Sequence, residues 1–200
     1  MAKANDVVEL FLTQDDKKIN NIINKINNNN LIRKKIEQEN LDLIDIKKYN
    51  NKNIIFVFNK KFHEGVIGII ASKLSQIFSK PCFVVTESHD LLKCSIRSQN
   101  DININKTINK LIKNKLIISG GGHDEAGGFS AKKEQLLDIE KFINKEFEFL
   151  KTKNYSYFDT FAIFPKKNSS IISDLKSLEP FGKNNPEPIF YFKNIKSIKS

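Results

Sequence analysis

The densest group of residues suited to chemistry is a glycine cluster beside a histidine. The stretch "IISGGGHDEAGGFS", residues 117–130, holds five of the chain's eight glycines. Because glycine has no Cβ, Gly120, Gly121 and Gly122 can adopt positive φ and approach a ligand closely. Successive amides of such a turn can converge on an anion, and His123 adds a donor whose charge can change near neutral pH. The pattern predicts an anion-binding turn; the alternative is a tight turn in which His123 caps a strand.

Two familiar nucleotide-binding loops fit this stretch poorly. A P-loop requires a lysine directly after its last glycine, and none follows here. A dinucleotide-binding loop requires a helix after its glycines, whereas the residues after Gly128 have the pattern of a strand. The cluster therefore indicates an anion site of a different kind.

A second segment with the same chemistry is "HEGVIG", residues 63–68. It opens a predicted helix, so His63, Glu64 and Gly65 lie near free amides at the positive end of the helix. Gly65 again permits close approach of a ligand to the backbone.

The third segment is "CSIRS", residues 94–98, in a predicted strand. Alternation along a strand places Ser95 and Arg97 on one face, and Ser98 ends the segment. Arg97 is one of only two arginines in the chain, and its planar guanidinium suits phosphate. A surface arginine at a strand edge is the alternative, which the segment alone leaves open.

The elements that must position these residues follow from hydrophobic periodicity. Between residues 51 and 150, apolar strand patterns alternate with helical patterns, which predicts an α/β domain with a central mixed sheet flanked by helices. Ile77 and Ile112 are expected on the inward faces of their helices. The predicted strands are 53–58, 81–85, 92–98 and 126–131, and the predicted helices are 65–78, 104–116 and 134–150.

The segments on either side of this domain differ from it. Residues 6–48 predict helix, with a helix start at Thr13–Asp16. The run Asn27–Asn30 has low helix propensity and leaves a loop open there. We interpret residues 1–50 as a connector helix, with a frayed arm as the alternative. Residues 151–200 predict strands at 155–164 and 188–198, a short helix at 169–178 and a proline-rich loop at 179–188, as in the first part of a β domain.

Composition sets broad limits on location and partners. The chain has 200 residues, a formal net charge of +10 and a pI of about 9.4. A basic balance is expected for a nucleic-acid-binding protein, but the lysines are spread along the chain, as on a merely solubilising surface. No apolar run is long enough to span a membrane, and no signal-peptide pattern is present. Cys82 and Cys94 are expected to be buried free thiols in a reducing cytoplasm.

Taken together, these motifs resemble one family. "FHEGVIGIIASKL", "CSIRS" and "SGGGHDEAGGFS", in this order, are similar to the DHH-associated domain of the RecJ family of single-strand-specific exonucleases. "LEPFGKNNPEPIF" resembles the start of the oligonucleotide-binding (OB) domain that follows in that family. "NNNNLIRKKIEQE" resembles the family's connecting helix, with Asn30, Arg33 and Glu37 at matching positions.

The resemblance implies a function in DNA repair and recombination. The family removes nucleotides from the 5′ end of single-stranded DNA, using Mn²⁺ or Mg²⁺ held by a DHH domain. This sequence contains no DHH triplet and no D-x-D, so we expect the metal-binding domain to be missing and the chain to be inactive alone. We expect the OB domain to be cut short, because residues 151–200 contain only its first strands. We also expect a cytoplasmic monomer. The residues implied to bind DNA are Ser95, Arg97, Ser98, Gly120, Gly121, Gly122 and His123, followed by His63, Glu64 and Gly65.

Two alternatives remain open at this stage. The chain could be a stand-alone module that binds single-stranded nucleic acid. It could also be part of a DHH-superfamily phosphodiesterase that acts on short oligonucleotides or cyclic dinucleotides, although the "PFGKNNPEP" segment argues against that reading.

Overall fold

The computed structural model describes residues 4–99, 102–150, 159–162, 170–182 and 185–193. Contacts divide the chain into two compact units, Met1–Lys153 and Asn154–Ser200, and each is described by itself. None of the helices in the described parts combines the length and apolar character needed to cross a bilayer.

The N-terminal connector forms two helices, and the second begins at the predicted helix start. Helix α1 (Ala4–Leu12) folds back along α2 (Asp16–Asp42), and two ion pairs, Glu9–Lys18 and Asp6–Lys25, join them. The break lies at Thr13–Asp15, because the Asp15 carboxylate accepts the amides of Lys17 and Lys18 and so caps α2. A short 3₁₀ helix, η1 (Ile46–Tyr49), follows.

The asparagine run does not interrupt α2. Residues 27–30 all lie inside this helix of 27 residues, so the loop reading of that run is wrong. Each asparagine costs only a fraction of a kcal/mol, roughly 0.7 at most, relative to alanine in a helix. Once the flanking turns have formed, propagation through four such residues is cheaper than starting a new helix.

The predicted mixed sheet forms the centre of the first unit, with five strands. The strands are β1 (Ile55–Phe58), β2 (Cys82–Ser88), β3 (Leu91–Arg97), β4 (Ser119–Gly122) and β5 (Ala126–Lys132). Their order is β1-β2-β3-β5-β4; β1 and β2 run parallel and the other neighbours antiparallel. Strand β4, formed by the glycine cluster itself, was not predicted.

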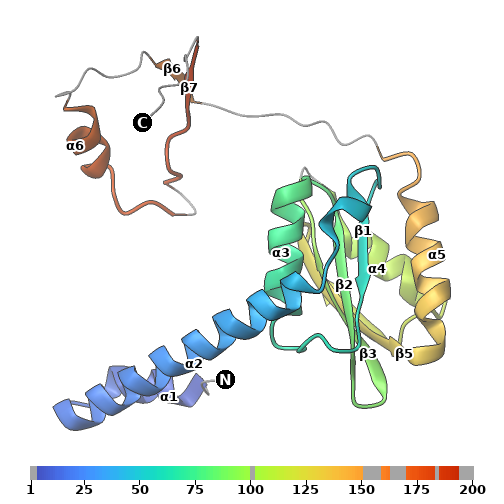
Figure 1. Cartoon of the computed structure of the whole chain (residues 1–200), viewed down its shortest axis with the longest axis horizontal. Helices are drawn as coiled ribbons and strands as arrows, with labels where there is room; N and C mark the ends of the chain where they lie inside the picture. Colours follow the sequence, from blue (N-terminus) through green and yellow to red (C-terminus); the bar gives the residue numbers. More distant parts are fainter. Residues whose placement is uncertain (1–3, 100–101, 151–158, 163–169, 183–184, 194–200) are drawn as a thin grey trace. The chain divides into compact units, whose positions relative to one another are not determined.

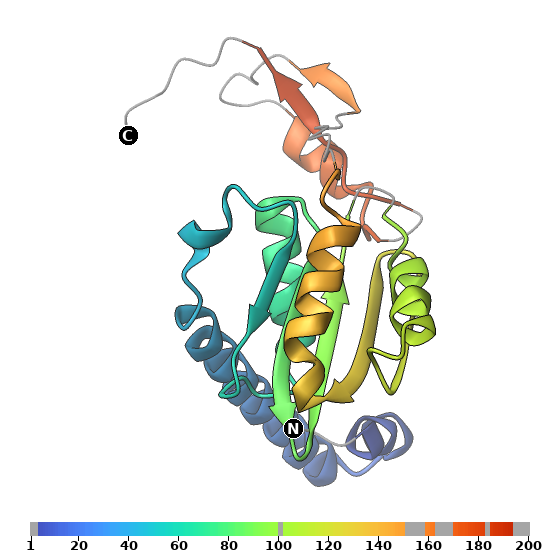
Figure 2. The same cartoon turned by 90° about the vertical axis from the view of Figure 1, so that its right-hand side faces the viewer.

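Three helices cover the sheet in a sandwich. Helix α3 (Ile67–Phe78) lies on one face, and α4 (Ile104–Lys113) and α5 (Leu136–Glu146) lie on the other (Figures 1 and 2). A 3₁₀ turn, η2 (Lys133–Gln135), precedes α5. The α4–α5 side buries the larger cluster, which includes Phe83, Ile108 and Ile143, and the α3 side buries Ile55, Val84 and Leu74.

Two expected core positions lie outside the core. Ile77 is 59% exposed and Ile112 is 44% exposed. On α3 the buried stripe runs through Ile67, Ala71 and Leu74, so the next position of the stripe falls one residue after Ile77. On α4 the stripe through Ile108 and Leu111 leaves Ile112 at its margin.

The second unit contributes short elements. Strand β6 (Thr160–Ala162) pairs parallel with β7 (Phe190–Phe192), and α6 (Ile171–Lys176) lies between them in sequence. Phe161 and Tyr191 meet edge to face, with ring centroids 5.6 Å apart. The predicted short helix is confirmed, whereas parts of the two predicted strands lie outside the described residues.

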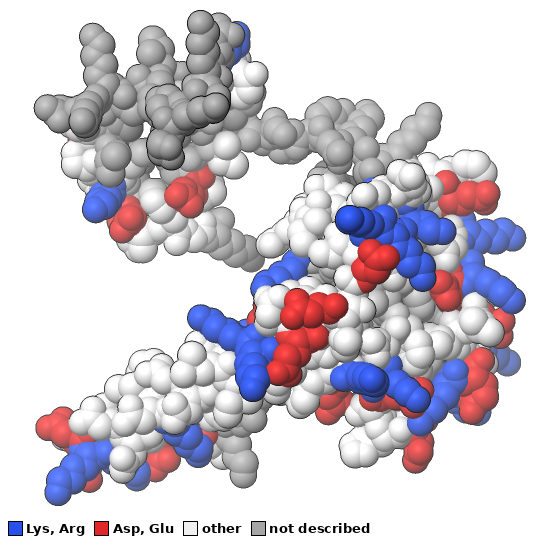
Figure 3. Space-filling view, in the orientation of Figure 1, with Lys and Arg blue, Asp and Glu red and all other residues white. Residues whose placement is uncertain are grey.

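Charges on the face in Figure 3 are mixed. Basic and acidic side chains are interspersed there and do not gather in one basic patch. The net positive charge therefore does not by itself locate a binding site.

The two cysteines yield a prediction about thiol reactivity. Cys82 and Cys94 are free and buried, and Cα pairing sets them opposite Arg97 and Val85, out of register with each other. Burial raises the pKa of both thiols, so little thiolate forms at mildly alkaline pH. We expect neither to react with a disulfide reagent in the folded chain and both to react in denaturant. Fast reaction of the native protein would contradict their burial.

Candidate nucleic-acid interface

One half of a sheet face is left open by the helices. Helix α3 packs on this face against β2 and β3 and covers apolar residues of β1 and β2. The face continues past the helix onto β5 and β4, and from β3 onward its side chains are small or polar. Strand register puts these residues on one side, because directly paired residues share a face. We call this set the open face; none of its members is fully buried. It comprises Lys93, Ser95, Arg97, Ser119, Gly121, Ala126, Gly128 and Ser130.

Arg97 and Ser95 form the polar centre of the open face. One guanidinium nitrogen of Arg97 donates to Ser95 Oγ at 3.3 Å and to the Ile96 carbonyl at 2.8 Å. These bonds fold the guanidinium back along β3 beside Ser95. The prediction that Ser95 and Arg97 share a strand face is confirmed.

The first turn of α3 lies against this centre. A Cβ built on Gly68 would be 3.2 Å from Ser95 Oγ and 3.4 Å from a nitrogen of the Arg97 guanidinium. The absence of a side chain at Gly68 therefore lets the positive end of the helix approach both groups. The first amides of a helix lack helical acceptors and favour an anion.

The glycine cluster has a different structural role from the one predicted. Residues 119–122 form a strand, and no described glycine has positive φ. The glycines are instead required by close packing. A Cβ on Gly120 would lie 2.9 Å from Phe129 Cβ, one on Gly127 would lie 2.6 Å from Ile108 Cδ1, and one on Gly122 would collide with the Ala126 carbonyl oxygen.

Gly121 is the exception within the cluster. A Cβ at this position would meet no atom within 4 Å. Its register partner is Gly128, which in turn pairs with Ser95 across β5 and β3. Gly121 therefore lies on the open face beside the polar centre, with space in front of its backbone.

His123 lies at the end of the open face next to Arg97. It begins the loop between β4 and β5, where its amide donates to the Ala126 carbonyl at 2.7 Å. Its exposed side chain borders a hollow of about 630 Å³. Asn103, Lys106, Asp124, Glu125 and Ala126 complete the lining. The carbonyl of Asp124 accepts the Ile104 amide at 2.9 Å, which ties this loop to the start of α4.

The other predicted site residues lie outside the open face. His63, Glu64 and Gly65 are exposed in the loop before α3, where His63 Nδ1 accepts the Gly65 amide at 3.0 Å. Ser98 is only 5% exposed, and its hydroxyl donates to the Gln99 carbonyl. It lies beyond the end of β3 and outside the open face.

The register also adds residues that the motifs did not indicate. Lys93 and Ser130 are paired across β3 and β5, and Lys93 Nζ donates to Ser130 Oγ at 2.9 Å. The alternation of Lys93, Ser95 and Arg97 was visible in the sequence. The partner strand was not, because nothing local specifies that β5 pairs with β3.

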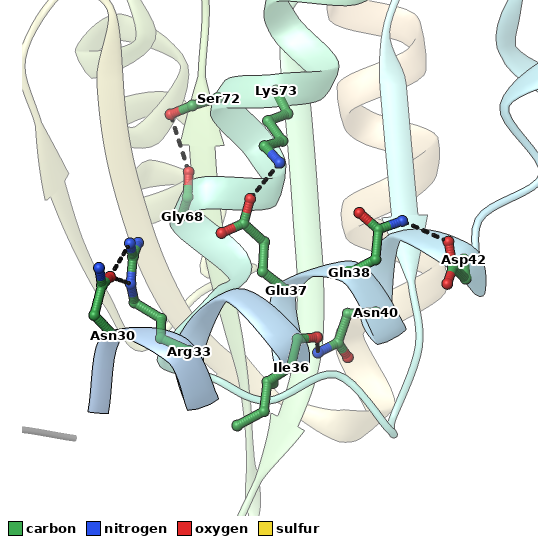
Figure 4. Close-up of polar contacts among 10 residues, drawn as sticks. All are labelled: Asn30, Arg33, Ile36, Glu37, Gln38, Asn40, Asp42, Gly68, Ser72 and Lys73. Atoms are coloured by element: carbon green, nitrogen blue, oxygen red, sulfur yellow. Dashed lines mark hydrogen bonds and ion pairs between the residues drawn. The ribbon is translucent and has the colours of Figure 1, made fainter. Parts of the chain in front are cut away.

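The connecting helix α2 is fastened to α3 near this site. Figure 4 shows Glu37, which is 6% exposed, pointing from α2 to Lys73 on α3, with Oε1 and Nζ 2.5 Å apart. One helical turn earlier, Asn30 Oδ1 accepts two bonds from the Arg33 guanidinium, at 2.7 and 3.3 Å. The spacing of Asn30, Arg33 and Glu37 places them on one side of α2.

The described residues do not fit a catalytic metal. No group of three or more histidine, cysteine, aspartate or glutamate side chains in them could hold a metal ion. The Asp124 carboxylate, beside His123, accepts a hydrogen bond from the Asn103 side-chain amide at 2.5 Å. The open face offers a guanidinium, an ammonium and hydroxyl groups, which are donors suited to an anion.

Comparison with known proteins agrees with this architecture. Residues 50–148 match the DHHA1 domain family, and residues 160–200 match the RecJ OB domain family. The single-stranded-DNA-specific exonuclease RecJ of Thermus thermophilus is 24% identical over 95% of this chain, and that of Bacillus subtilis is 24% identical over 93%. The chain belongs to the RecJ family. It spans about a quarter of the length of these curated relatives, which is 28% and 25% respectively.

Solved RecJ structures have the same fold. Crystal structures of RecJ from Thermus thermophilus in complex with Mn²⁺ and with Mg²⁺ each superpose with a TM-score of 0.80 at 23% identity, covering 94% of this chain. They are matched over 28% and 30% of their own chains. A further exonuclease RecJ bound to manganese gives a TM-score of 0.64 over 74% of this chain and 37% of its own.

The two neighbouring glycines Gly121 and Gly122 should respond oppositely to alanine. Gly122→Ala should lower the free energy of unfolding by about 1–3 kcal/mol, because its methyl group collides with backbone. Gly121→Ala should change it by less than about 0.5 kcal/mol, because its methyl group points into open space at an ordinary φ. Denaturant unfolding of both variants and the unchanged chain measures this. Equal destabilisation would show that Gly121 is packed, and that the open face is misassigned.

Proposed function

We propose that the open face binds single-stranded DNA and serves as the substrate-holding part of a RecJ-like 5′-to-3′ exonuclease acting in DNA repair and recombination. The observation that carries the proposal is the Arg97–Ser95 pair, placed between the first turn of α3 and the bare backbone of Gly121 and Gly128. The family relationship supports it, since the curated relatives are named as single-stranded-DNA-specific exonucleases.

The geometry suits a phosphodiester backbone. The Arg97 fork supplies charge-assisted donors, and Ser95 Oγ lies beside it. Glycine backbone at Gly121 and Gly128 lets the strand lie close to the sheet. None of the eight residues that define the open face is acidic; the nearest acidic residues that line the hollow at its end are Asp124 and Glu125 beside His123. Contacts to phosphate position a strand without reading its sequence, as a general exonuclease requires.

We assign hydrolysis to a separate metal-binding domain. Two-metal phosphodiester hydrolysis needs a cluster of hard ligands, and the described residues contain no such cluster. The proposal therefore gives this chain the binding and orientation of the strand, and gives bond cleavage to a metal-binding DHH domain. Holding the scissile bond in a fixed place is a large part of such catalysis.

Arg97→Ala should weaken the binding of an oligothymidylate by about 1–2 kcal/mol, roughly fivefold to thirtyfold in Kd. The reason is the loss of a charge-assisted contact to phosphate. The measurement is fluorescence anisotropy at low salt, with thermal unfolding to show an unchanged fold. Lys141→Ala is the matched control, because this exposed lysine lies on α5, on the other face of the sheet. Equal effects of the two variants would show that binding depends only on net charge, and would refute the site.

The chain by itself should release no mononucleotides from 5′-labelled single-stranded DNA in Mn²⁺. The sequence lacks a DHH triplet and a D-x-D, and the open face offers no metal ligands. Product analysis on a denaturing gel, with a RecJ exonuclease as the positive control, measures this. Metal-dependent release that copurifies with the chain and disappears in Arg97→Ala would show that cleavage resides here.

A further inference from the structure

The open face extends beyond its Arg97–Ser95 centre. Lys93 precedes Ser95 by two residues on β3, so its side chain leaves the same face of the sheet. The separation along the strand is about 6.6–6.8 Å. Across β5 it pairs with Ser130, which pairs in turn with Ser119 of β4. A second row of polar groups therefore lies parallel to the row of Ser95, Gly128 and Gly121.

Lys93 carries a charge that the described surroundings leave uncompensated. Its ammonium donates to the neutral hydroxyl of Ser130. Several other lysines pair with carboxylates, among them Lys73 with Glu37 and Lys133 with Glu87. Lys93 has no such ion pair within the described part of the chain. An ammonium has three donors, so its bond to Ser130 leaves two for a ligand.

The neighbour of Lys93 on β2 does not supply a carboxylate either. Thr86 of β2 is its register partner and is buried. The Thr86 hydroxyl donates to the Phe62 carbonyl at 2.7 Å, and so serves the loop before α3. Lys93 is partly exposed, so an anion can reach its ammonium. The open side of the face is the direction from which one can do so.

We propose that Lys93, oriented by Ser130, binds a second phosphate of the same DNA strand, one step along β3 from the phosphate at Arg97 and Ser95. The inference rests on the proposed function and adds a direction to it: the strand follows β3 from the His123 end of the open face toward the β2–β3 turn. A positively charged groove that tracks the backbone is the usual means of binding single strands without sequence preference. A purely structural cross-strand bond between Lys93 and Ser130 is the reading to be excluded.

The test measures oligothymidylate binding to the 200-residue chain by anisotropy over a series of salt concentrations. The variants are Lys93→Met, which keeps the apolar stem, and Lys93→Gln, which keeps a donor for Ser130 and removes the charge. Lys141→Met, on the opposite face, controls for net charge, and Arg97→Ala reports on the centre of the site. We expect both Lys93 variants to weaken binding about tenfold at low salt. We also expect the slope of log K against log salt to become shallower by about 0.7, the value for one phosphate contact on a single strand.

The outcomes separate the two levels of the proposal. If Arg97→Ala weakens binding while both Lys93 variants match Lys141→Met in affinity and salt slope, the second phosphate contact is wrong and the proposed function stands. If the unchanged chain does not bind, or Arg97→Ala has no effect, the proposed function itself fails and the inference fails with it. Should Lys93→Met unfold the chain, Lys93→Gln decides the question, because it retains a hydrogen-bond donor toward Ser130.

Discussion

The close approach of β4 and β5 to their neighbours is the constraint on which the open face depends. Ile104 and Ile108 of α4 press against Gly127, and Phe129 and Ile108 press against Gly120. A Cβ at either glycine would force the strands away from the helix. Because the sheet packs this tightly on its α4 side, β4 can pair with β5 and bring Gly121 level with Gly128 and Ser95.

The two faces of the sheet carry different side chains. Toward α4 and α5 it presents large apolar side chains, such as Phe83, Ile96 and Phe129, which close the core. Toward α3 it presents apolar residues only as far as β2, and then changes to serine, glycine, alanine, lysine and arginine. Leaving such a surface uncovered costs little hydrophobic free energy, because it contains little apolar area. An uncovered polar face with two cationic side chains is suited to an extended anionic ligand.

Helix α2 connects this surface to the N-terminal part of the chain. The Glu37 carboxylate is nearly inaccessible to solvent and is paired with Lys73 on α3. Removing Lys73 would leave the Glu37 carboxylate without a partner in a poorly solvated place. Helix α3 carries both Lys73 at its middle and Gly68 at its first turn, so the anchor of the connector and the wall of the open face belong to one rigid element.

The sequence alone determined the alternation of strands and helices, the mixed α/β class and the family, because hydrophobic period and the spacing of glycine, serine, arginine and histidine are local properties. It also placed Ser95 and Arg97 on one face, since strand alternation needs no tertiary information. The prediction of a turn with positive φ at the glycine cluster was wrong. A glycine required by backbone torsion and a glycine required by close packing look the same in a sequence. The helix start at Thr13–Asp16 could also be predicted, because an N-cap aspartate is a local signal, and the cap at Asp15 confirms it.

Only the tertiary structure decided which strands are neighbours. The pairing of β3 with β5, between segments more than twenty residues apart, places Ser130 beside Lys93 and Gly128 beside Ser95. It also distinguishes Gly121, which faces open space, from Gly120 and Gly122, which do not, and it removes Ser98 from the surface. These distinctions depend on long-range register, which is set by the packing of whole elements and is not encoded in any short segment.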